Sequence, residues 1–199
     1  LGDGTLDYRT VPALVAGQAV PTPTASPAPG RAVFTSMAGG GSHTCGLTAV
    51  GKAYCWGDNS SGQLGTGSGG ADRVVPVAVG GDLAFASLTT GNHHTCGLTA
   101  SGDAWCWGGN DLGQVGDGTR GTGANDHSAD RASPVPVTGG LTFSTLSAGF
   151  SSTCGLTRAG AAYCWGSPLG GATPAPVGGN APYASITTGY SHACALTAS

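Results

Sequence analysis

One segment recurs along the chain and constrains its fold more than any other feature. HTCGLTAVGKAYCWG begins at His43, HTCGLTASGDAWCWG at His94 and STCGLTRAGAAYCWG at Ser152, and the shortened copy HACALTAS begins at His192. The leading cysteines of these copies are about 40 to 60 residues apart, a period typical of propellers and solenoids. The sequence therefore predicts a repeat protein.

Each full copy has the pattern of a β-hairpin, with alternating residue types on either side of a three-residue loop. The loops, at residues 49–51, 100–102 and 158–160, all end in glycine, which adopts the left-handed conformation that such loops need. Counting outward from the turn places Cys45 opposite Cys55 at a non-hydrogen-bonded pair, where Cα atoms lie about 4.5 Å apart, within disulfide range. The same count gives three predicted disulfides: Cys45–Cys55, Cys96–Cys106 and Cys154–Cys164.

The seventh cysteine, Cys194, opens a hairpin whose second strand would carry its partner beyond Ser199, so it is predicted to be unpaired. At the other end, LGDGT from Leu1 matches the end of NDLGQVGDGT, which begins at Asn110. We therefore expect these residues to be a window on a longer polypeptide, or a cleaved piece of one.

Composition narrows the cellular setting and the partners. The chain has 38 glycines and 12 prolines, only 9% charged residues and a formal net charge of −3, which argues against nucleic acid as a partner. No apolar run approaches the roughly 18 residues of a membrane span. Because cytosolic thiols are kept reduced, regularly paired cysteines predict an extracellular, periplasmic or cell-surface protein.

An aromatic residue opens each repeat, eleven positions before the leading cysteine. These residues are Phe34, Phe85, Phe143 and Tyr183. They divide the chain into predicted units at 1–33 (partial), 34–84, 85–142, 143–182 and 183–199 (partial). Two segments interrupt the repeat, a Pro- and Thr-rich loop at 19–31 and a polar loop at 119–131.

The repeated HTCGLT and CWG, the NxxGQLG stretch at 59–65 and the RxxPxxV stretch at 73–79 resemble the repeats of the regulator of chromosome condensation family. The resemblance covers nearly the whole chain and implies an all-β fold, a partial propeller with about four of seven blades. The paired cysteines are more similar to secreted bacterial versions of the repeat than to the eukaryotic members.

Metal and catalytic sites are not predicted. His43, His94 and His192 each lie two residues before a cysteine. Zinc requires a closed tetrahedral set of ligands, however, and every cysteine except Cys194 already has a predicted cross-strand partner. These histidines are instead expected to fill turns and hydrogen-bond locally. The tryptophans of the CWG segments are expected to pack between blades; they are Trp56, Trp107 and Trp165.

The acidic residues of the second half do not form a recognisable site either. They are Asp111, Asp117, Asp126 and Asp130, and their spacing lacks the DxDxDG pattern of a calcium loop. No nucleophile, base or carboxylate pair stands outside the repeat, so the sequence predicts no catalytic residue, no cofactor and no enzyme.

Loops that break a repeat are where a scaffold acquires its own function. The predicted function is therefore a non-enzymatic, secreted or surface-displayed module for protein binding, or a structural subunit, with a protein or further blades of the same chain as partner. Small-molecule ligands are not expected. The candidate contact residues are Thr22, Thr24, Arg120, Asp126, His127 and Asp130.

Two alternatives remain open. The first is a protein inhibitor, because the fold resembles that of secreted bacterial β-lactamase inhibitors; exposed aromatic residues in face loops would favour it, and the two interrupting loops have almost none. The second is nucleotide exchange on the Ran GTPase with chromatin binding, as in the founding family member. The acidic charge balance and the oxidised cysteines argue against this second reading.

Overall fold

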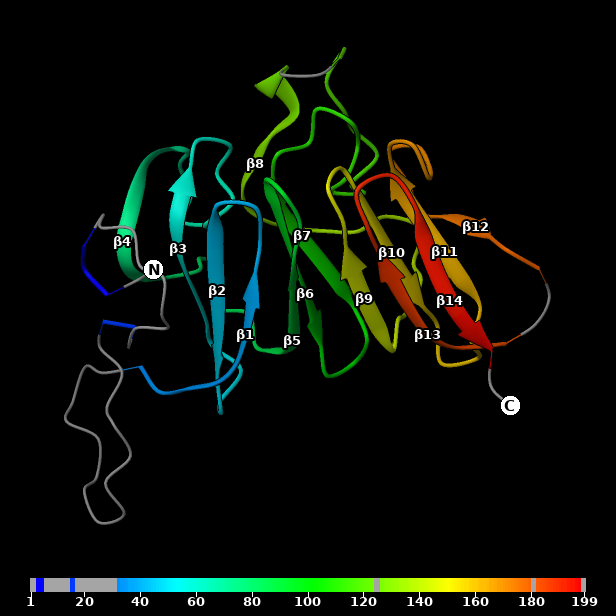
Figure 1. The fold of residues 1–199 in the computed structure, drawn as a ribbon, viewed down its shortest axis with the longest axis horizontal. Helices are drawn as coiled ribbons and strands as arrows, with labels where there is room; N and C mark the ends of the chain where they lie inside the picture. The colour runs from blue at the N-terminus through cyan, green and yellow to red at the C-terminus, as the bar shows by residue number, and fades with distance from the viewer. Residues whose placement is uncertain (1–2, 6–14, 17–31, 124–125, 180–181, 198–199) are drawn as a thin grey trace.

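The chain folds into antiparallel β-sheets that follow one another along an arc in sequence order (Figure 1). This computed structural model describes residues 3–5, 15–16, 32–123, 126–179 and 182–197. Within them lie three four-stranded sheets and one two-stranded sheet, each corresponding to one blade or its beginning. The predicted all-β partial propeller is confirmed.

The strands of each blade follow the chain as a meander, so neighbours in sequence are neighbours in the sheet. Blade 1 contains β1 (Phe34–Gly39), β2 (His43–Thr48), β3 (Ala53–Asn59) and β4 (Gly70–Ala78). Blade 2 contains β5 (Phe85–Thr90), β6 (His94–Thr99), β7 (Ala104–Gly108) and β8 (Arg131–Pro136), with the short 3₁₀ helix η1 (His127–Ala129) before β8. Blade 3 contains β9 (Thr145–Ala148), β10 (Ser152–Leu156), β11 (Ala162–Gly166) and β12 (Ala175–Val177), and blade 4 contains β13 (Tyr183–Thr188) and β14 (Ala193–Thr197).

The first strand of each blade lies next to the first strand of the following blade. Contacts join β1 to β5, β5 to β9 and β9 to β13, so these strands form the inner side of the arc. In a meander, the turn after the first strand and the loop after the third lie at the same end of the sheet. We call this end, uppermost in Figure 1, the upper face; the three-residue hairpin loops lie on the opposite, lower face.

The hairpin register agrees with the sequence prediction in all three complete blades. Cys45 pairs with Cys55 across β2 and β3, and the corresponding pairs hold in the next two blades. All three pairs are disulfide-bonded with Cα atoms 4.1 Å apart. The loop glycine Gly51 has a φ of 80°, as the three-residue loop requires.

Removing one hairpin disulfide tests its contribution to stability. In the double variant Cys96→Ser/Cys106→Ser, we expect the free energy of unfolding to fall by about 2 to 3 kcal/mol, because the unfolded chain regains the entropy of an open loop. Urea denaturation of the oxidised protein measures this change. Cys194→Ser is the matched control, since Cys194 is free and exposed; an equal loss in both variants would contradict the prediction.

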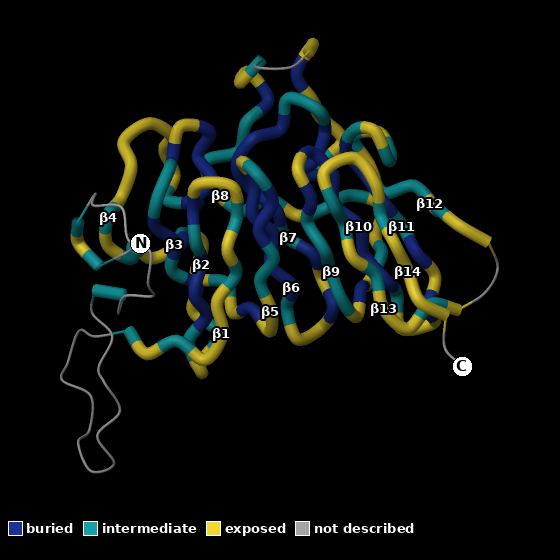
Figure 2. Tube along the Cα trace, viewed as in Figure 1, coloured by how far each residue is buried: buried dark blue, intermediate teal, exposed yellow. Residues whose placement is uncertain are grey.

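The hydrophobic core lies between blades as well as within them, and buried positions concentrate in the middle strands (Figure 2). One cluster combines Leu47, Leu64 and Val79 of blade 1 with Phe85 and Trp107 of blade 2. A second cluster repeats this arrangement between blades 2 and 3, with Trp165 in the place of Trp107. The prediction that these tryptophans pack between blades is therefore confirmed for both.

The glycine in the CGL segment is needed because an aromatic ring covers it. A Cβ atom on Gly97 would lie 2.4 Å from Cδ1 of Phe85, and one on Gly155 would lie 2.5 Å from Cδ1 of Phe143. In the three complete blades, the opening aromatic residue thus packs directly on the backbone of the second strand. Among the described residues, no helix is long and apolar enough to cross a membrane.

Candidate interaction face

The upper face carries the longest and least regular loops of the described chain. The loop between β7 and β8, residues 109–130, rises from this face in Figure 1 and includes all but the last residue of the insertion at 119–131 that the sequence analysis singled out. The turns after β1, β5, β9 and β13 reach the same face beside the axis. Among the described residues, the variation between repeats is therefore concentrated on the upper face.

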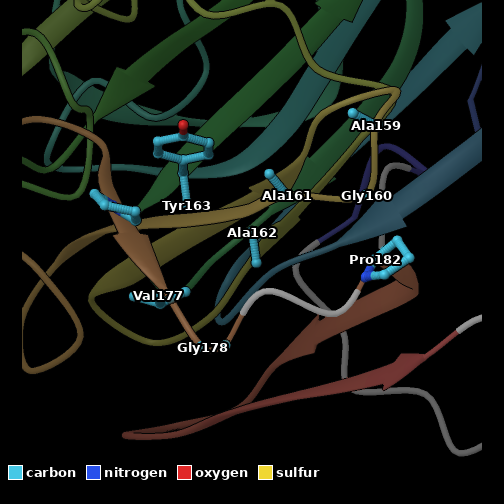
Figure 3. A pocket seen from close by; sticks show the side chains of 10 residues that line it. Ala159, Gly160, Ala161, Ala162, Tyr163, Val177, Gly178 and Pro182 are labelled. Atoms are coloured by element: carbon cyan, nitrogen blue, oxygen red, sulfur yellow. The ribbon is translucent and has the colours of Figure 1, made fainter.

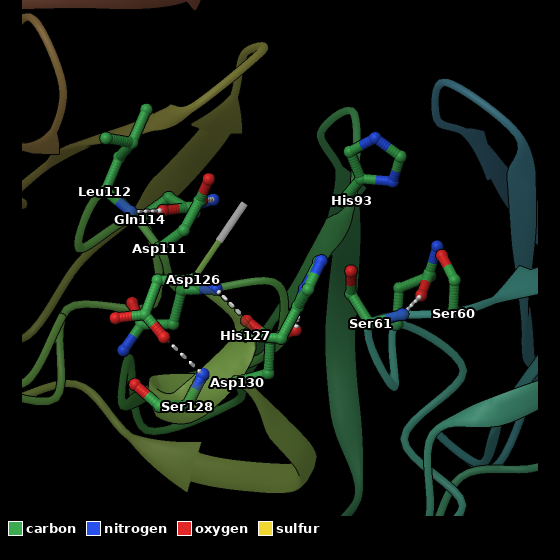
Figure 4. A network of polar contacts seen from close by, with 12 residues as sticks. Ser60, Ser61, His93, Asp111, Leu112, Gln114, Asp126, His127, Ser128 and Asp130 are labelled. Atoms are coloured by element: carbon green, nitrogen blue, oxygen red, sulfur yellow. Dashed lines mark hydrogen bonds and ion pairs between the residues drawn. The ribbon is translucent and has the colours of Figure 1, made fainter. Parts of the chain in front are cut away.

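Asp126 holds the insertion together from within. Its carboxylate accepts hydrogen bonds from the Thr122 backbone N–H at 2.7 Å, the Thr122 hydroxyl at 2.8 Å and the Ser128 N–H at 3.0 Å, capping η1 (Figure 4). These hydrogen bonds, led by the one from Thr122 N–H, hold the pKa of Asp126 well below its usual range. Asp126 thus stabilises the conformation of the loop by joining Thr122 to Ser128.

Asp130 ties the insertion to the blade. One carboxylate oxygen accepts a hydrogen bond from the Asn110 N–H at 2.8 Å, and the other lies 2.8 Å from Nδ1 of His127. Nearby, Nε of Arg131 donates to Asp117 at 2.6 Å. Partial burial of Asp117 opposes its ionisation, but hydrogen bonds from Thr119 and Arg131 outweigh this and lower its pKa.

The structure thus separates the predicted contact residues into two kinds. Asp126 and Asp130 are half-buried and engaged inside the loop, whereas Arg120 and His127 are exposed at its surface. Thr22 and Thr24 lie outside the described residues. A role in partner contact remains a prediction for all six.

The turns after β1, β5, β9 and β13 follow one another along the inner side of the arc, around the axis of the propeller, and one position in them differs in every repeat. It lies four residues before each leading cysteine and is occupied by Gly41, Asn92, Phe150 and Tyr190. The backbone N–H of this residue donates to the carbonyl oxygen of a glycine in the next blade's turn. The pairs are Gly41 to Gly91 at 3.1 Å, Asn92 to Gly149 at 3.2 Å and Phe150 to Gly189 at 3.2 Å. We call these four turns the axial turns.

The last two axial turns present an aromatic pair to solvent. The ring centroids of Phe150 and Tyr190 are 4.0 Å apart, with an angle of 30° between the ring planes. Tyr190 is 67% exposed and Phe150 37% exposed, although large apolar side chains are otherwise mostly packed between blades. The sequence analysis missed this pair because it looked for aromatic residues only in the interrupting loops; aligning the repeats at this variable position would have found it.

Below the axial turns, buried side chains connect each blade to the next. Nε2 of His43 lies 2.8 Å from the Thr95 hydroxyl, which donates to the backbone carbonyl of Gln63 at 3.0 Å. His94, Thr153 and Gln114 repeat the arrangement, with distances of 2.9 Å for both bonds. We call each set a seam relay. For His43 and His94 the expectation of local hydrogen bonds is wrong, because the partner threonine belongs to the following blade; for His192 it stays a prediction.

The relay fixes the tautomer of its histidine. Because the threonine proton is donated to a carbonyl, the threonine oxygen accepts from Nε2–H, so in the neutral imidazole Nδ1 carries no proton. Nδ1 of His43 and of His94 is buried without a hydrogen-bond partner among the described residues. Burial lowers the pKa to about 4 for His43, against the opposing effect of Asp58, and to about 3 for His94. Both imidazoles are therefore neutral near pH 7.

The two relay histidines predict loss of stability in acid. Their folded-state pKa values lie below the unfolded value near 6.5, so their contribution is complete above pH 6.5 and is lost as pH falls toward 4 and 3. We expect the free energy of unfolding to drop by about 2 to 3 kcal/mol per pH unit below 6. Urea denaturation between pH 7.5 and 4.5 measures the slope.

His94→Ser provides the matched variant for this prediction, because blade 3 has Ser152 at the same position. Removing one of the two buried imidazoles should reduce the slope by about half. An unchanged slope in this variant would show that other groups cause the acid sensitivity.

No catalytic arrangement is found among the described residues. Two exposed imidazoles lie near a carboxylate: Nδ1 of His127 is 2.8 Å from Asp130, and Nδ1 of His93 is 3.7 Å from Asp58, apart from the hydrogen bonds of the insertion (Figure 4). No serine hydroxyl is hydrogen-bonded to either ring in the described part of the chain. The same residues contain no group of three His, Cys, Asp or Glu side chains that could hold a metal ion.

A cavity of about 560 Å³ on the lower side of blade 3 is equally poor in reactive groups. Figure 3 shows that small side chains such as Ala161, Ala162 and Val177 line it, and the Tyr163 phenol is its one polar side-chain group. It therefore offers neither an acid–base pair nor a cluster of ligands for a cofactor.

Comparison with known families explains the arrangement. Models of the regulator of chromosome condensation (RCC1) repeat match residues 34–63, 85–114 and 143–169, and a second model of the same repeat matches 50–98. The chain belongs to the RCC1 repeat family. The matches to the first model begin at Phe34, Phe85 and Phe143, the aromatic residues that open the complete blades.

Relatives of this RCC1-repeat chain have diverse names. It is 32% identical over 134 residues to the ultraviolet-B receptor UVR8 of Arabidopsis thaliana, covering 65% of this chain and 28% of the relative. It is 30% identical over 140 residues to the mitochondrial RCC1 domain-containing protein RUG3 of the same plant, covering 67% and 30%. The chain thus spans less than a third of the length of either relative.

Solved structures support the same fold. The ectodomain of the receptor kinase CR4 from Physcomitrella patens superimposes with a TM-score of 0.58 and 27% identity, over 84% of this chain and 36% of that one. Prp20p of Saccharomyces cerevisiae, described with its binding to Gsp1p and histones, has a TM-score of 0.70 at 21% identity, over 83% of this chain and 44% of that one. At that identity, the likeness to Prp20p concerns the fold.

Proposed function

We propose that this chain is a non-enzymatic β-propeller module that binds a protein partner through its upper face, outside the reducing cytoplasm. The observation that carries the proposal is the disulfide at the same hairpin position in each complete blade, with its cysteines at most 1% exposed. Regular pairing of this kind is stable in an oxidising compartment. The similarity to a receptor ectodomain supports a secreted or surface-displayed setting.

The upper face supports the binding part of the proposal. Hydrogen bonds of Asp126 and Asp130 brace the described part of its insertion, in which Arg120 and His127 are exposed. Pre-ordered loops lose less conformational entropy when they bind. Functional residues are also more often found on loops that a rigid scaffold positions.

Further units of the same repeat are the second kind of partner that we infer. Leu196 of β14 is 70% exposed, whereas its counterparts Leu47, Leu98 and Leu156 are at most 5% exposed against neighbouring blades. At the other end, Met37 of β1 is 60% exposed. Both end faces thus have the chemistry of an internal seam.

The thiol state tests the proposed compartment. In protein purified from its own cells under acid quench and denatured without reduction, the six cysteines of the three hairpin pairs should resist alkylation, because each is held in a disulfide. After reduction, all 7 cysteines should be labelled. Seven labels before reduction would refute the oxidising location.

Site-specific cross-linking tests the binding face. A photo-reactive amino acid is placed at Arg120 or His127 on the upper face, and at Val50, which is 81% exposed on the lower face, as the control. Irradiation in living cells should capture one identifiable protein from the upper positions only. Equal capture from Val50, or none from any position, would refute the proposed function.

A specific observation favours inhibition of a secreted enzyme as a second candidate. The exposed pair of Phe150 and Tyr190 is the kind of rigid aromatic anchor that forms hot spots in protein interfaces. If the captured partner is an enzyme, its activity with and without a molar excess of the purified module distinguishes inhibition from simple binding.

A further inference from the structure

A cavity opens on the upper face where the axial turns meet. Its volume is about 300 Å³, and it is lined by residues of all four axial turns and of the strands leading into them. The lining residues with side chains larger than alanine are Thr90, Asn92, Phe150, Thr188 and Tyr190. No charged side chain lines this axial pocket.

The floor of the axial pocket is bare backbone. A Cβ atom on Gly40 would lie 2.5 Å from the carbonyl oxygen of Gly91, and one on Gly91 would lie 2.4 Å from that of Gly149. Glycine is therefore required where successive turns meet, because the carbonyl of the next turn and the histidine ring of the same blade occupy the space that a side chain would need. This part of the pocket is thus formed by closely packed main chain rather than by side chains.

The wall of the pocket is aromatic and is fixed in place. The Phe150 N–H donates to the Gly189 carbonyl at 3.2 Å, which joins the turns of blades 3 and 4 beneath the two tilted rings. Aromatic rings favour offset or edge-to-face contact with a further ring, and exposed apolar patches of this kind are typical of interaction sites. The pair thus presents a preformed face for another ring.

Two polar groups at the pocket remain available. The Asn92 carboxamide and the Tyr190 phenol make no hydrogen bond within the described part of the chain, and both residues line the pocket. An occupant with a polar edge could pair with them, while a charged occupant would lose hydration without a counter-charge. The chemistry selects a neutral ring that carries a hydrogen-bonding group.

We propose that the axial pocket receives one tyrosine or tryptophan side chain from the tip of a loop of the partner protein. The inference rests on the proposed function and specifies the centre of its contact. The pocket is shallow and open to solvent, and a volume near 300 Å³ lies at the small end of ligand pockets, which suits a single ring side chain. Tyrosine and tryptophan are also the residues most enriched at the centres of protein interfaces.

A panel of short peptides tests the pocket directly. Disulfide-closed hairpin peptides, identical except for Tyr, Trp, Leu, Lys or Ala at the tip, are titrated into the folded protein and followed by NMR. We expect the Tyr and Trp peptides to bind at least tenfold more tightly than the Ala and Lys peptides. In Tyr190→Ala this preference should be lost, whereas in Val50→Ala, on the lower face, it should persist.

Three outcomes would overturn the inference: equal binding of all tips, a preference that survives Tyr190→Ala, or tighter binding of methyl glycosides than of the ring peptides, which would assign the pocket to a carbohydrate. A melting temperature for Tyr190→Ala close to that of the wild type shows that its loss of binding is local. A photo-reactive residue at Asn92 separates this inference from the proposed function. Capture from His127 but not from Asn92 would refute the axial contact alone.

Discussion

Replacing Trp107 by alanine is expected to lower the free energy of unfolding by about 4 kcal/mol, the largest single effect that the structure predicts. The indole is completely buried at the seam between blades 1 and 2, where it belongs to the core cluster of Leu64 and Val79. Its Nε1 also donates to the Gln63 carbonyl at 2.9 Å. The substitution therefore opens a cavity at the seam and removes an inter-blade hydrogen bond.

Trp105 provides a matched control two residues away on the same strand. It is only partly buried and packs at the edge of the same cluster, so Trp105→Ala should cost roughly half as much. Urea denaturation followed by circular dichroism measures both variants. Equal losses would show that the two indoles contribute alike and that the seam has no special importance.

The second large effect is expected for Thr153→Val, which keeps the shape of the side chain but removes its hydroxyl. Thr153 is fully buried, and its hydroxyl accepts from His94 and donates to the Gln114 carbonyl. The valine would leave a buried N–H and a buried C=O without this partner, at a cost of about 3 kcal/mol. The same denaturation experiment measures the loss.

Thr153→Ser separates the hydrogen bonds from packing. Serine retains the hydroxyl and loses only a methyl group, so its cost should remain near 1 kcal/mol. A serine variant as unstable as the valine variant would assign the effect to packing. Thr95 occupies the corresponding place between blades 1 and 2, where the pair of substitutions can be repeated.

The hairpins were predictable from sequence because their geometry is local. Cys45 and Cys55 are ten positions apart in the sequence. The glycine that ends the loop between them indicates the turn type, and the turn type sets the register of the two strands. The opening aromatic residues and the tryptophans were also accessible, because they recur in phase. The division of the chain into units remains a prediction.

The seam relays were not predictable, because each joins residues of different repeats. His43 and Thr95 are 52 positions apart, and only the angle between two blades brings them to hydrogen-bond distance. The repeated HTC segment contains both residue types. It does not show that the threonine of one copy is the hydrogen-bond partner of the histidine in the preceding copy. Side-chain partners across an interface depend on packing, which residue periodicity does not encode.

The interaction face was predictable in part. Composition located the insertion at 119–131 but could not show that Asp126 and Asp130 turn inward while Arg120 and His127 turn outward. The axial pocket was missed because it combines single positions from four turns. Such a site has no signature within any one repeat.

The placement of the disulfides also bears on how a chain of this kind changes in evolution. Every bond joins two strands of one hairpin, and none connects different blades among the described residues. A duplication or deletion of one whole unit therefore adds or removes both sulfurs of a pair together, and leaves no reactive thiol to mispair during oxidative folding. The number of blades can therefore vary without changing how the cysteines of the remaining blades are paired.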